Sequence, residues 1–198
     1  MRRGAAQGRH HRELIAGILL AAGEARRFGR QKLLESLDGV SLVRGAARRF
    51  LEAGLQPVVV VVSPDPRLRK ALDGLDVQLV ENQAAESGIA GSIALGVSAL
   101  PASAQAVMIG VADQPHLTAQ ELSRLMAAHR EGGITVARYD DHRGNPAIFD
   151  RPFFGELAQL SGDRGGQLVV AAHPEAVLEV SLPPMMGIDI DRPEDWPA

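Results

Sequence analysis

The chain has 198 residues, of which 45% are apolar and only 4% aromatic, and its formal net charge is −3. This length suits one ordinary domain with a core of Val, Leu, Ile and Ala. The slightly acidic balance argues against a general nucleic-acid-binding protein, and the absence of cysteine excludes disulfides, thiolate metal sites and cysteine nucleophiles.

Residues 1–12 are basic and lack hydrophobic periodicity, which predicts a disordered tail ahead of a single domain at residues 13–198. Arginines before the apolar run at 14–22 superficially resemble a signal peptide. Glu13 interrupts that junction, however, and cleavage after Ala22 would delete the first strand of the fold. We therefore expect a cytoplasmic protein, and no apolar run is long enough to span a membrane.

Residues 14–20 form an apolar run without alternation, which predicts a buried parallel strand. The run ends in Ala21, Ala22 and Gly23, whose small size lets backbone N–H groups come close to a ligand. Four cations follow: Arg26, Arg27, Arg30 and Lys32. Small residues followed by converging positive charge suit the triphosphate of a nucleotide. Neither GxxxxGK[ST] nor GxGxxG is present, so this is neither a P-loop nor a dinucleotide fingerprint.

Strands and helices are predicted to alternate along the next hundred residues. Three apolar runs predict strands, at residues 57–63, 76–80 and 105–111. Helical spacing occurs at residues 41–53, 91–100 and 118–130, and the last opens with the capping box Thr118 and Glu121. This alternation predicts an α/β fold, a three-layer, Rossmann-like arrangement with a mostly parallel sheet and helices on both faces.

The C-terminal part is less regular. Residues 134–138 and 147–149 predict a hairpin around the polar segment 139–145, and residues 177–180 and 188–190 predict two short strands. Short helices are expected at residues 153–160 and 167–172, with a turn at 161–166 between them. The six histidines lack metal-ligand spacing outside the tail, and we expect them at the surface.

Asp113 directly follows the predicted strand at residues 105–111, and Pro115 stiffens the exit from it. In open α/β sheets ligands lie outside the carboxyl ends of the strands, and a carboxylate there can hold Mg²⁺. The alternative is an ordinary turn leading into a helix, in which Asp and Pro are common. We expect Asp113 to be exposed, so that its replacement changes stability by no more than about 0.5 kcal/mol.

Asp189 and Asp191 are predicted to share one side of an extended segment, because side chains alternate there. Two carboxylates on one face repel each other unless a cation lies between them. Asp191 also stands where it would cap a helical turn beginning near Pro193. Both roles are compatible, and we expect Asp191 to bind metal with Asp189 as its neighbour.

The loop reads LAAGxxxRFGxxK, made of Leu20, Ala21, Ala22, Gly23, Arg27, Phe28, Gly29 and Lys32. It resembles the signature loop of nucleotidyltransferases that activate sugars and cofactors with a nucleoside triphosphate. The Ala-Ala-Gly form with Arg-Phe-Gly most resembles the molybdenum cofactor cytidylyltransferases. Their loop commonly carries Ser two residues after the glycine, where this chain has Ala25. The resemblance extends over about residues 14–196.

Five later segments extend the resemblance. Asp-Gln-Pro at 113–115 and the acidic end at 189–195 are similar to the family's metal-binding segments. Gly88 and Ser92 match an N-x5-G-x3-S stretch near the nucleotide, and Asp163 matches a Gly-Asp-x-Gly turn. Residues 143–146 resemble a Gly-His-Pro segment on the cofactor side, with Asn145 in place of His.

The resemblance implies that the phosphate of molybdopterin attacks the α-phosphate of CTP and releases pyrophosphate. It implies that Lys32 and Arg27 neutralise the triphosphate and that Asp113 helps catalysis as a ligand of Mg²⁺, together with Asp191 and Asp189. The positions expected to bind nucleotide or cofactor are Leu20, Ala21, Ala22, Gly23, Gly88, Ser92 and Asp163.

The implied partners are CTP, molybdopterin and a molybdoenzyme or its chaperone, with no nucleic acid and no membrane. Two alternatives remain open, namely a sugar phosphate or another phosphorylated acceptor, and a non-catalytic accessory protein that binds nucleotide or cofactor.

Overall fold

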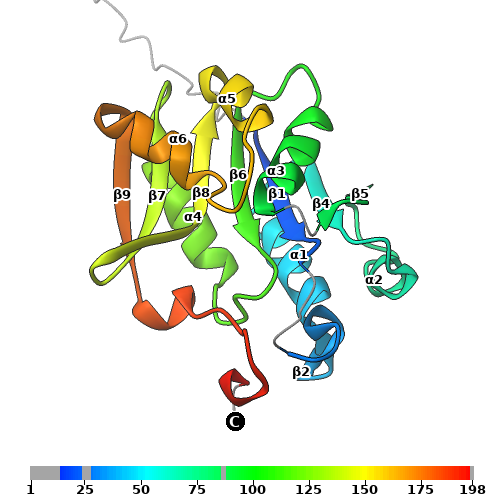
Figure 1. Ribbon diagram of the computed structural model, residues 1–198. Helices are drawn as coiled ribbons and strands as arrows, with labels where there is room; N and C mark the ends of the chain where they lie inside the picture. The colour runs from blue at the N-terminus through cyan, green and yellow to red at the C-terminus, as the bar shows by residue number, and fades with distance from the viewer. Residues whose placement is uncertain (1–13, 24–27, 86–87, 197–198) are drawn as a thin grey trace, which may run out of the picture.

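The computed structural model describes residues 14–23, 28–85 and 88–196, and these residues form one seven-stranded sheet and a small two-stranded ribbon. The main sheet has the order β5-β4-β1-β6-β8-β7-β9 (Figure 1). Only β8 runs against its neighbours. The strands are β1 Ile15–Ala21, β4 Val58–Val62, β5 Gln78–Glu81, β6 Ala106–Val111, β7 Ile134–Tyr139, β8 His142–Asp150 and β9 Val177–Leu182. The ribbon pairs β2 Ser36–Leu37 with β3 Val40–Ser41.

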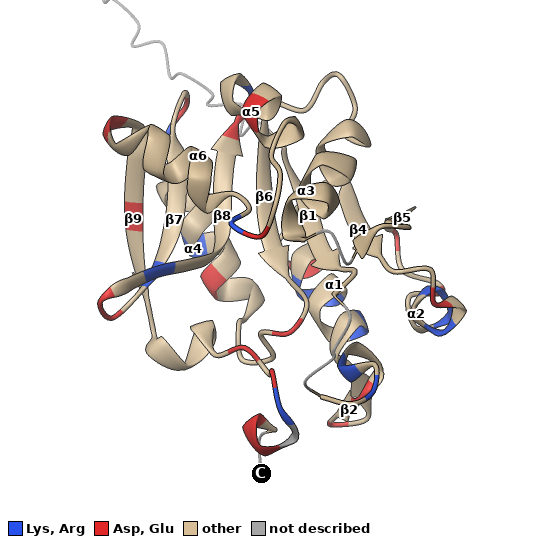
Figure 2. Cartoon of the chain, viewed as in Figure 1, with Lys and Arg blue, Asp and Glu red and all other residues tan. Residues whose placement is uncertain are grey.

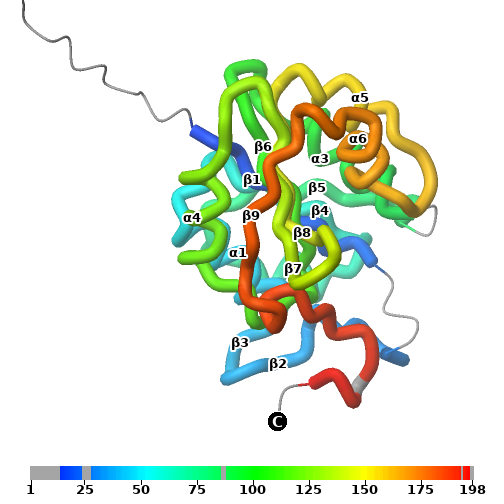
Figure 3. The backbone as a smooth tube through the Cα atoms, turned by 90° about the vertical axis from the view of Figure 1, so that its left-hand side faces the viewer, coloured from blue at the N-terminus to red at the C-terminus, as the bar shows by residue number. Residues whose placement is uncertain are grey.

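Helices cover both faces of the sheet, as Figure 3 shows with the sheet seen edge-on. On one face lie α1 Leu42–Glu52, α2 Pro66–Ala71 and α4 Ala119–Ala128, and on the other α3 Ile89–Ser98, α5 Phe154–Ala158 and α6 Gln167–Ala172. The two hydrophobic clusters between sheet and helices are the two halves of the core. The predicted three-layer, mostly parallel architecture is therefore confirmed. Among the described residues, no helix has the length and apolar character needed to cross a membrane.

The position of β1 in the sheet explains why apolar and polar residues do not alternate along it. All seven residues of β1 are buried. Leu19 packs into the cluster beneath α1, whereas Ile18 and Leu20 pack into the cluster beneath α3. Because both faces of the strand are covered, apolar residues are favoured at every position.

The predicted strands and helices up to residue 130 all form, with ends shifted by a few residues. The C-terminal hairpin also forms, as β7 and β8. The strand predicted at residues 188–190 does not form. This segment makes one backbone bond to the loop after β6, from Ile190 N–H to the Asp113 carbonyl at 2.9 Å, and joins no ladder. Helix α2 and the ribbon were not anticipated, because six-residue and two-residue elements carry too little periodicity.

His129 corrects the expectation that the histidines lie at the surface. Its side chain is only 8% exposed. One ring nitrogen lies 2.9 Å from Thr135 Oγ1 and the other 2.8 Å from Asp150 Oδ1. The ring is buried because both nitrogens find polar partners there, which removes the cost of desolvating them.

Two helical glycines give a matched test of packing. A Cβ on Gly96 in α3 would lie 2.7 Å from Ile18 Cγ2, whereas one on Gly45 in α1 meets only the flexible end of Arg49, at 3.3 Å. We expect Gly96→Ala to lower the free energy of unfolding by about 1–2 kcal/mol, because overpacking outweighs the gain in helix propensity. We expect Gly45→Ala to be neutral or to stabilise by up to about 1 kcal/mol. Urea unfolding measures both, and equal shifts would contradict the close contact between α3 and β1.

The topology gathers one set of loops at one edge of the sheet. The carboxyl ends of β1, β4, β5, β6 and β7 lie at the lower edge in Figure 1, where antiparallel β8 begins. The loops after β1 and β6 follow neighbouring strands, and the chain returns to this edge after β9. Binding residues are expected at such an edge, next to the point where strand order reverses.

Candidate active site

Acidic residues from two distant parts of the chain meet beyond this edge. Figure 2 shows the acidic loop after β6 and the acidic C-terminal segment gathered below the sheet. The bond from Ile190 N–H to the Asp113 carbonyl joins them. Ile190 itself is fully buried in the core, which anchors the segment between Asp189 and Asp191.

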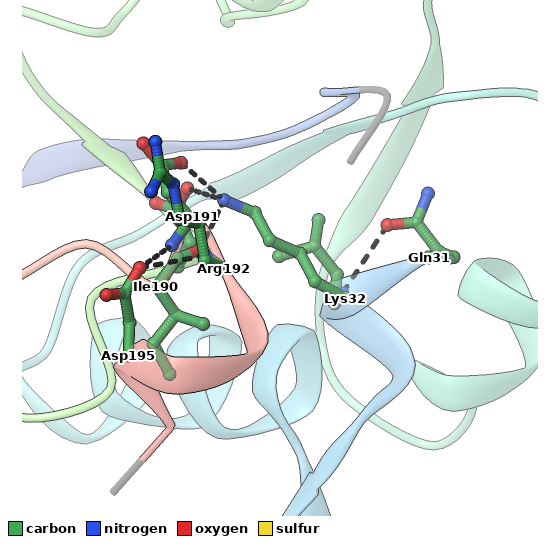
Figure 4. Close-up of polar contacts among 8 residues, drawn as sticks. Gln31, Lys32, Ile190, Asp191, Arg192 and Asp195 are labelled. Carbon is green, nitrogen blue, oxygen red and sulfur yellow. Dashed lines mark hydrogen bonds and ion pairs between the residues drawn. The ribbon is translucent and has the colours of Figure 1, made fainter. Parts of the chain in front are cut away.

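Lys32 lies at the centre of this acidic cluster. Its Nζ donates to Asp113 Oδ2 at 2.8 Å, to the Ile190 carbonyl at 2.5 Å and to Asp191 Oδ1 at 3.2 Å (Figure 4). The Lys32 side chain is 11% exposed, against 22% for Asp113 and 50% for Asp191. The loop after β1, the loop after β6 and the C-terminal segment are thus joined through one ammonium group.

The charge of Lys32 is fixed by its surroundings. Burial by itself lowers the pKa of the ammonium, but the charges and hydrogen bonds of Asp113 and Asp191 outweigh it. The pKa of Lys32 therefore stands above its ordinary value, and the group is a cation throughout the physiological range. Local geometry places it, because Lys32 opens a short helical turn, Lys32–Leu34, in which the Gln31 side chain accepts from Leu33 N–H (Figure 4).

Asp189 lies beside the cluster, and its surroundings oppose its ionisation. Although the residue as a whole is exposed, its carboxyl group is enclosed enough that burial, followed by the negative charge of Asp113, raises its pKa to about 6. A hydrogen bond from Gln114 partly opposes this. Asp189 is thus held close to other carboxylates, as expected when a cation offsets their repulsion.

The cluster has capacity for a further cation. Asp113 Oδ1 is buried and, within the described residues, has no hydrogen-bond partner. Lys32 pairs with Asp113 and Asp191, and Asp189 adds a third carboxylate beside them. No three His, Cys, Asp or Glu side chains in the described ranges converge closely enough to hold a metal ion by themselves. A divalent ion here would need oxygen ligands from a bound molecule, such as a phosphate, in addition to Asp113 and Asp191.

The turn after Asp191 is closed by a different residue from the one expected. Asp195 Oδ2 accepts from Asp191 N–H at 3.0 Å and from Arg192 N–H at 2.8 Å (Figure 4). The carboxylate of Asp191 instead accepts from Lys32. Asp195 therefore caps this turn and leaves Asp191 directed to the acidic cluster.

A cavity of about 360 Å³ opens at the same edge, on the face covered by α3 and α6. Its floor is apolar and includes Leu20, Ile93 and Phe149. Its polar lining consists of Arg143, Asn145, Asp163, Arg164 and Gln167. An apolar floor with a few converging polar groups, in a volume of roughly 300–1,000 Å³, is typical of small-molecule sites.

The sequence-predicted binding positions separate into two groups. Leu20 and Asp163 line the cavity. Gly88 begins α3 with φ +107° and packs against the turn that holds Asp163, since a Cβ there would lie 2.4 Å from Asp163 Oδ1. Ser92 is 5% exposed and does not line the cavity, because its hydroxyl accepts from Asn82 Nδ2 at 2.9 Å. Ser92 therefore supports the start of α3 from within the core.

The loop after β1 is described only in part. Ala21 and Ala22 are buried, so they offer backbone rather than side chains, and Gly23 is exposed. Arg27 and Ala25 lie outside the described residues, as does the basic tail. Arg30 is described and forms an exposed ion pair with Glu35 at 2.7 Å, away from the acidic cluster.

Tyr139 connects the cavity with the acidic segment and had not been expected to do so. Its hydroxyl donates to the carbonyl of Asn145 at 2.6 Å, and its ring lies so close to Gly187 that a Cβ there would come within 2.6 Å. The Ile190 carbonyl was also missed, whereas the buried Gln114 belongs to the predicted Asp-Gln-Pro segment. A backbone carbonyl leaves no signal in the sequence. Tyr139, however, is the only tyrosine in the chain, and this rarity could have marked it as a candidate.

Comparison with known proteins gives a consistent result. Residues 17–177 match the family model described as a MobA-like NTP transferase domain. A nicotine blue oxidoreductase from Paenarthrobacter nicotinovorans is 31% identical over 81% of this chain and 83% of its own length. A probable molybdenum cofactor guanylyltransferase from Opitutus terrae is 35% identical over 64% of this chain and 61% of its own length.

Solved structures with a similar fold and sequence also exist. Rv0371c from Mycobacterium tuberculosis superimposes with a TM-score of 0.80 at 29% identity, over 92% of this chain and 95% of its own. A manganese complex of Rv0371c gives a TM-score of 0.75 over 92% of this chain and 95% of its own.

Proposed function

Because the chain belongs to the MobA-like NTP transferase family, we propose that it transfers CMP from CTP to the phosphate of molybdopterin and releases pyrophosphate. The observation that carries this proposal is the placement of two features at one edge of the sheet. The acidic cluster around Lys32 suits a triphosphate with its metal, and the cavity beside Leu20 suits the acceptor.

In the proposed reaction, an oxygen of the acceptor phosphate attacks the α-phosphorus of the nucleotide, and the bond from that phosphorus to the departing pyrophosphate oxygen breaks. The protein's task is alignment and neutralisation of charge rather than covalent catalysis. Lys32 would meet the phosphates, since it already carries a fixed positive charge at this edge. Arg27 is proposed to assist it from the preceding residues of the loop.

We propose that Asp113 and Asp191 hold a divalent cation, Mg²⁺ under cellular conditions, with Asp189 as a neighbouring carboxylate. Support comes from the unpartnered oxygen of Asp113, noted above for the described residues, and from the nearness of Asp191, which shares the Lys32 ammonium with it. When bound, such an ion would offset the negative charge that develops on the phosphates during transfer. Manganese is named for the Rv0371c complex, which is similar to this chain in fold and sequence.

We propose that the cavity receives the acceptor. Its apolar floor suits a flat heterocycle, and Arg143 and Arg164 stand in the lining for an anionic group. Asn145 lies where the cytidylyltransferases that the chain resembles carry His, so it would contribute an amide hydrogen bond in place of an imidazole. The product would then pass to a molybdoenzyme or its chaperone in the cytoplasm.

Gly88 gives a test of the acceptor side of this proposal. We expect Gly88→Ala to raise KM for molybdopterin about tenfold with a smaller effect on kcat, because displacing the Asp163 turn disturbs the cavity lining and removes ground-state binding. Gly162→Ala is the matched control. Gly162 also has a positive φ, of +79°, but no atom lies within 4 Å of its Cβ position. Steady-state kinetics at saturating nucleotide measure both, and equal effects would show that backbone strain causes the loss.

The decisive experiment supplies purified protein with molybdopterin, Mg²⁺ and each of the four nucleoside triphosphates, and measures pyrophosphate release. CTP is expected to give the highest kcat/KM, because the LAAGxxxRFG loop most resembles that of cytidylyltransferases. A preference for GTP would instead align the chain with the guanylyltransferase named for Opitutus terrae. Turnover with a sugar phosphate but not with molybdopterin would make the sugar phosphate the acceptor. Nucleotide binding without pyrophosphate release would indicate a non-catalytic accessory protein.

A further inference from the structure

The hydrogen bonds of Lys32 conflict with the task proposed for it. An ammonium has three N–H donors, and here three acceptors surround it, namely Asp113 Oδ2, the Ile190 carbonyl and Asp191 Oδ1. Lys32 can therefore meet a phosphate only by giving up at least one of these acceptors. The same two carboxylates are the ones that a divalent ion would need, so two cations compete for them.

The geometry indicates which of the three bonds is released most easily. The Ile190 carbonyl is the nearest acceptor, at 2.5 Å, and it is held by the buried Ile190 and by the backbone bond to Asp113. The bond to Asp191 is the longest, at 3.2 Å, and leads to a side chain that is half exposed. The lysine stem is flexible, whereas the turn that carries it is held by Gln31. The side chain can thus move while the backbone stays in place.

We propose that Lys32 is a resident counter-ion for Asp113 and Asp191 and that it leaves them for the phosphates when the nucleotide binds. This inference rests on the proposed function in one respect, that nucleotide phosphates draw the ammonium away. Before nucleotide arrives, Lys32 blocks the carboxylates and keeps divalent ions weakly bound. Afterwards Lys32 no longer competes with the ion for these carboxylates, so nucleotide and ion bind cooperatively.

The first test measures Mn²⁺ binding to the full chain without nucleotide, from the free Mn²⁺ signal in electron paramagnetic resonance. Lys32→Met, which keeps an unbranched stem but removes the charged end, is expected to bind Mn²⁺ at least tenfold more tightly than the wild type. Lys70→Met is the matched control, because Lys70 is exposed in α2 and is the other lysine of the chain. It should bind Mn²⁺ as the wild type does. Adding Asp113→Asn to Lys32→Met should abolish the gain.

The second test follows Lys32 directly and does not depend on a variant folding. Because the chain has two lysines, lysine labelled with ¹³C at Cε gives two signals, which Lys70→Arg assigns. A non-hydrolysable CTP analogue with Mg²⁺ is expected to shift the Lys32 signal and leave that of Lys70 in place. Millimolar Mg²⁺ alone should shift neither.

The outcomes separate this inference from the proposed function. Equal Mn²⁺ affinity in wild type and Lys32→Met, or a Lys32 signal that stays in place when nucleotide and Mg²⁺ bind, overturns the inference even if the chain transfers nucleotides. Tighter Mn²⁺ binding by Lys32→Met, in a chain that binds none of the four nucleotides, supports the counter-ion role and counts against the proposed function.

Discussion

Replacing Asp113 by Asn is expected to lower kcat by about three orders of magnitude, since losing a ligand that helps stabilise the transferring phosphoryl group costs on the order of 4 kcal/mol. The substitution keeps the shape of the side chain but removes its charge. It weakens both the proposed hold on Mg²⁺ and the bond from Lys32 Nζ to Asp113 Oδ2. Pyrophosphate release at saturating CTP, molybdopterin and Mg²⁺ measures the effect.

Asp141→Asn is the matched control, because the Asp141 side chain is 97% exposed and its replacement should leave kcat unchanged. Normal turnover by Asp113→Asn would show that Asp113 only forms a turn and takes no part in the reaction. The structure also changes the expected effect on stability. Asp113 is 22% exposed and pairs with a mostly buried ammonium, so its loss should cost about 1–3 kcal/mol rather than nothing. Kinetics must therefore be measured well below the melting temperature of the variant.

Lys32→Ala is expected to lower kcat by roughly two orders of magnitude, comparable to the loss of one preorganised charge donor. The physical reason is that a cation with a raised pKa, already placed at the edge of the sheet, would no longer oppose the charge that grows as pyrophosphate departs. The measurement is kcat and KM for the nucleoside triphosphate. A change mainly in kcat indicates a contact that strengthens in the transition state.

Two cations serve as controls for Lys32. Arg30→Ala removes a charge from the same loop but from an exposed pair with Glu35, and Lys70→Ala removes the other lysine. Both variants should keep kcat within about twofold, since surface charges away from the site contribute little. Equal, small effects at Lys32 and Arg30 would make the loop an ordinary basic turn, and the nucleotide proposal would lose its main support.

The sequence by itself determined the architecture and which loops meet at the edge of the sheet that carries the candidate site. Covered strands must be apolar at every position, and this local requirement is visible in the runs that became β1, β4 and β6. Because parallel strands end at one edge of a sheet, the same pattern predicted that the residues after β1 and β6 would meet. Lys32 and Asp113 do meet, 81 positions apart in the sequence, at 2.8 Å.

Tertiary structure alone decided how these groups are paired. The Ile190 carbonyl lies 158 positions from Lys32 and carries no side-chain signal, yet it is the nearest acceptor of the ammonium. Asp195 closes the turn expected of Asp191, and Ser92 bonds to Asn82 instead of lining the cavity. The physical reason is common to all of these cases. Periodicity reports which face of an element is buried, whereas a hydrogen-bond partner depends on angles and distances between elements that form only when the whole chain packs.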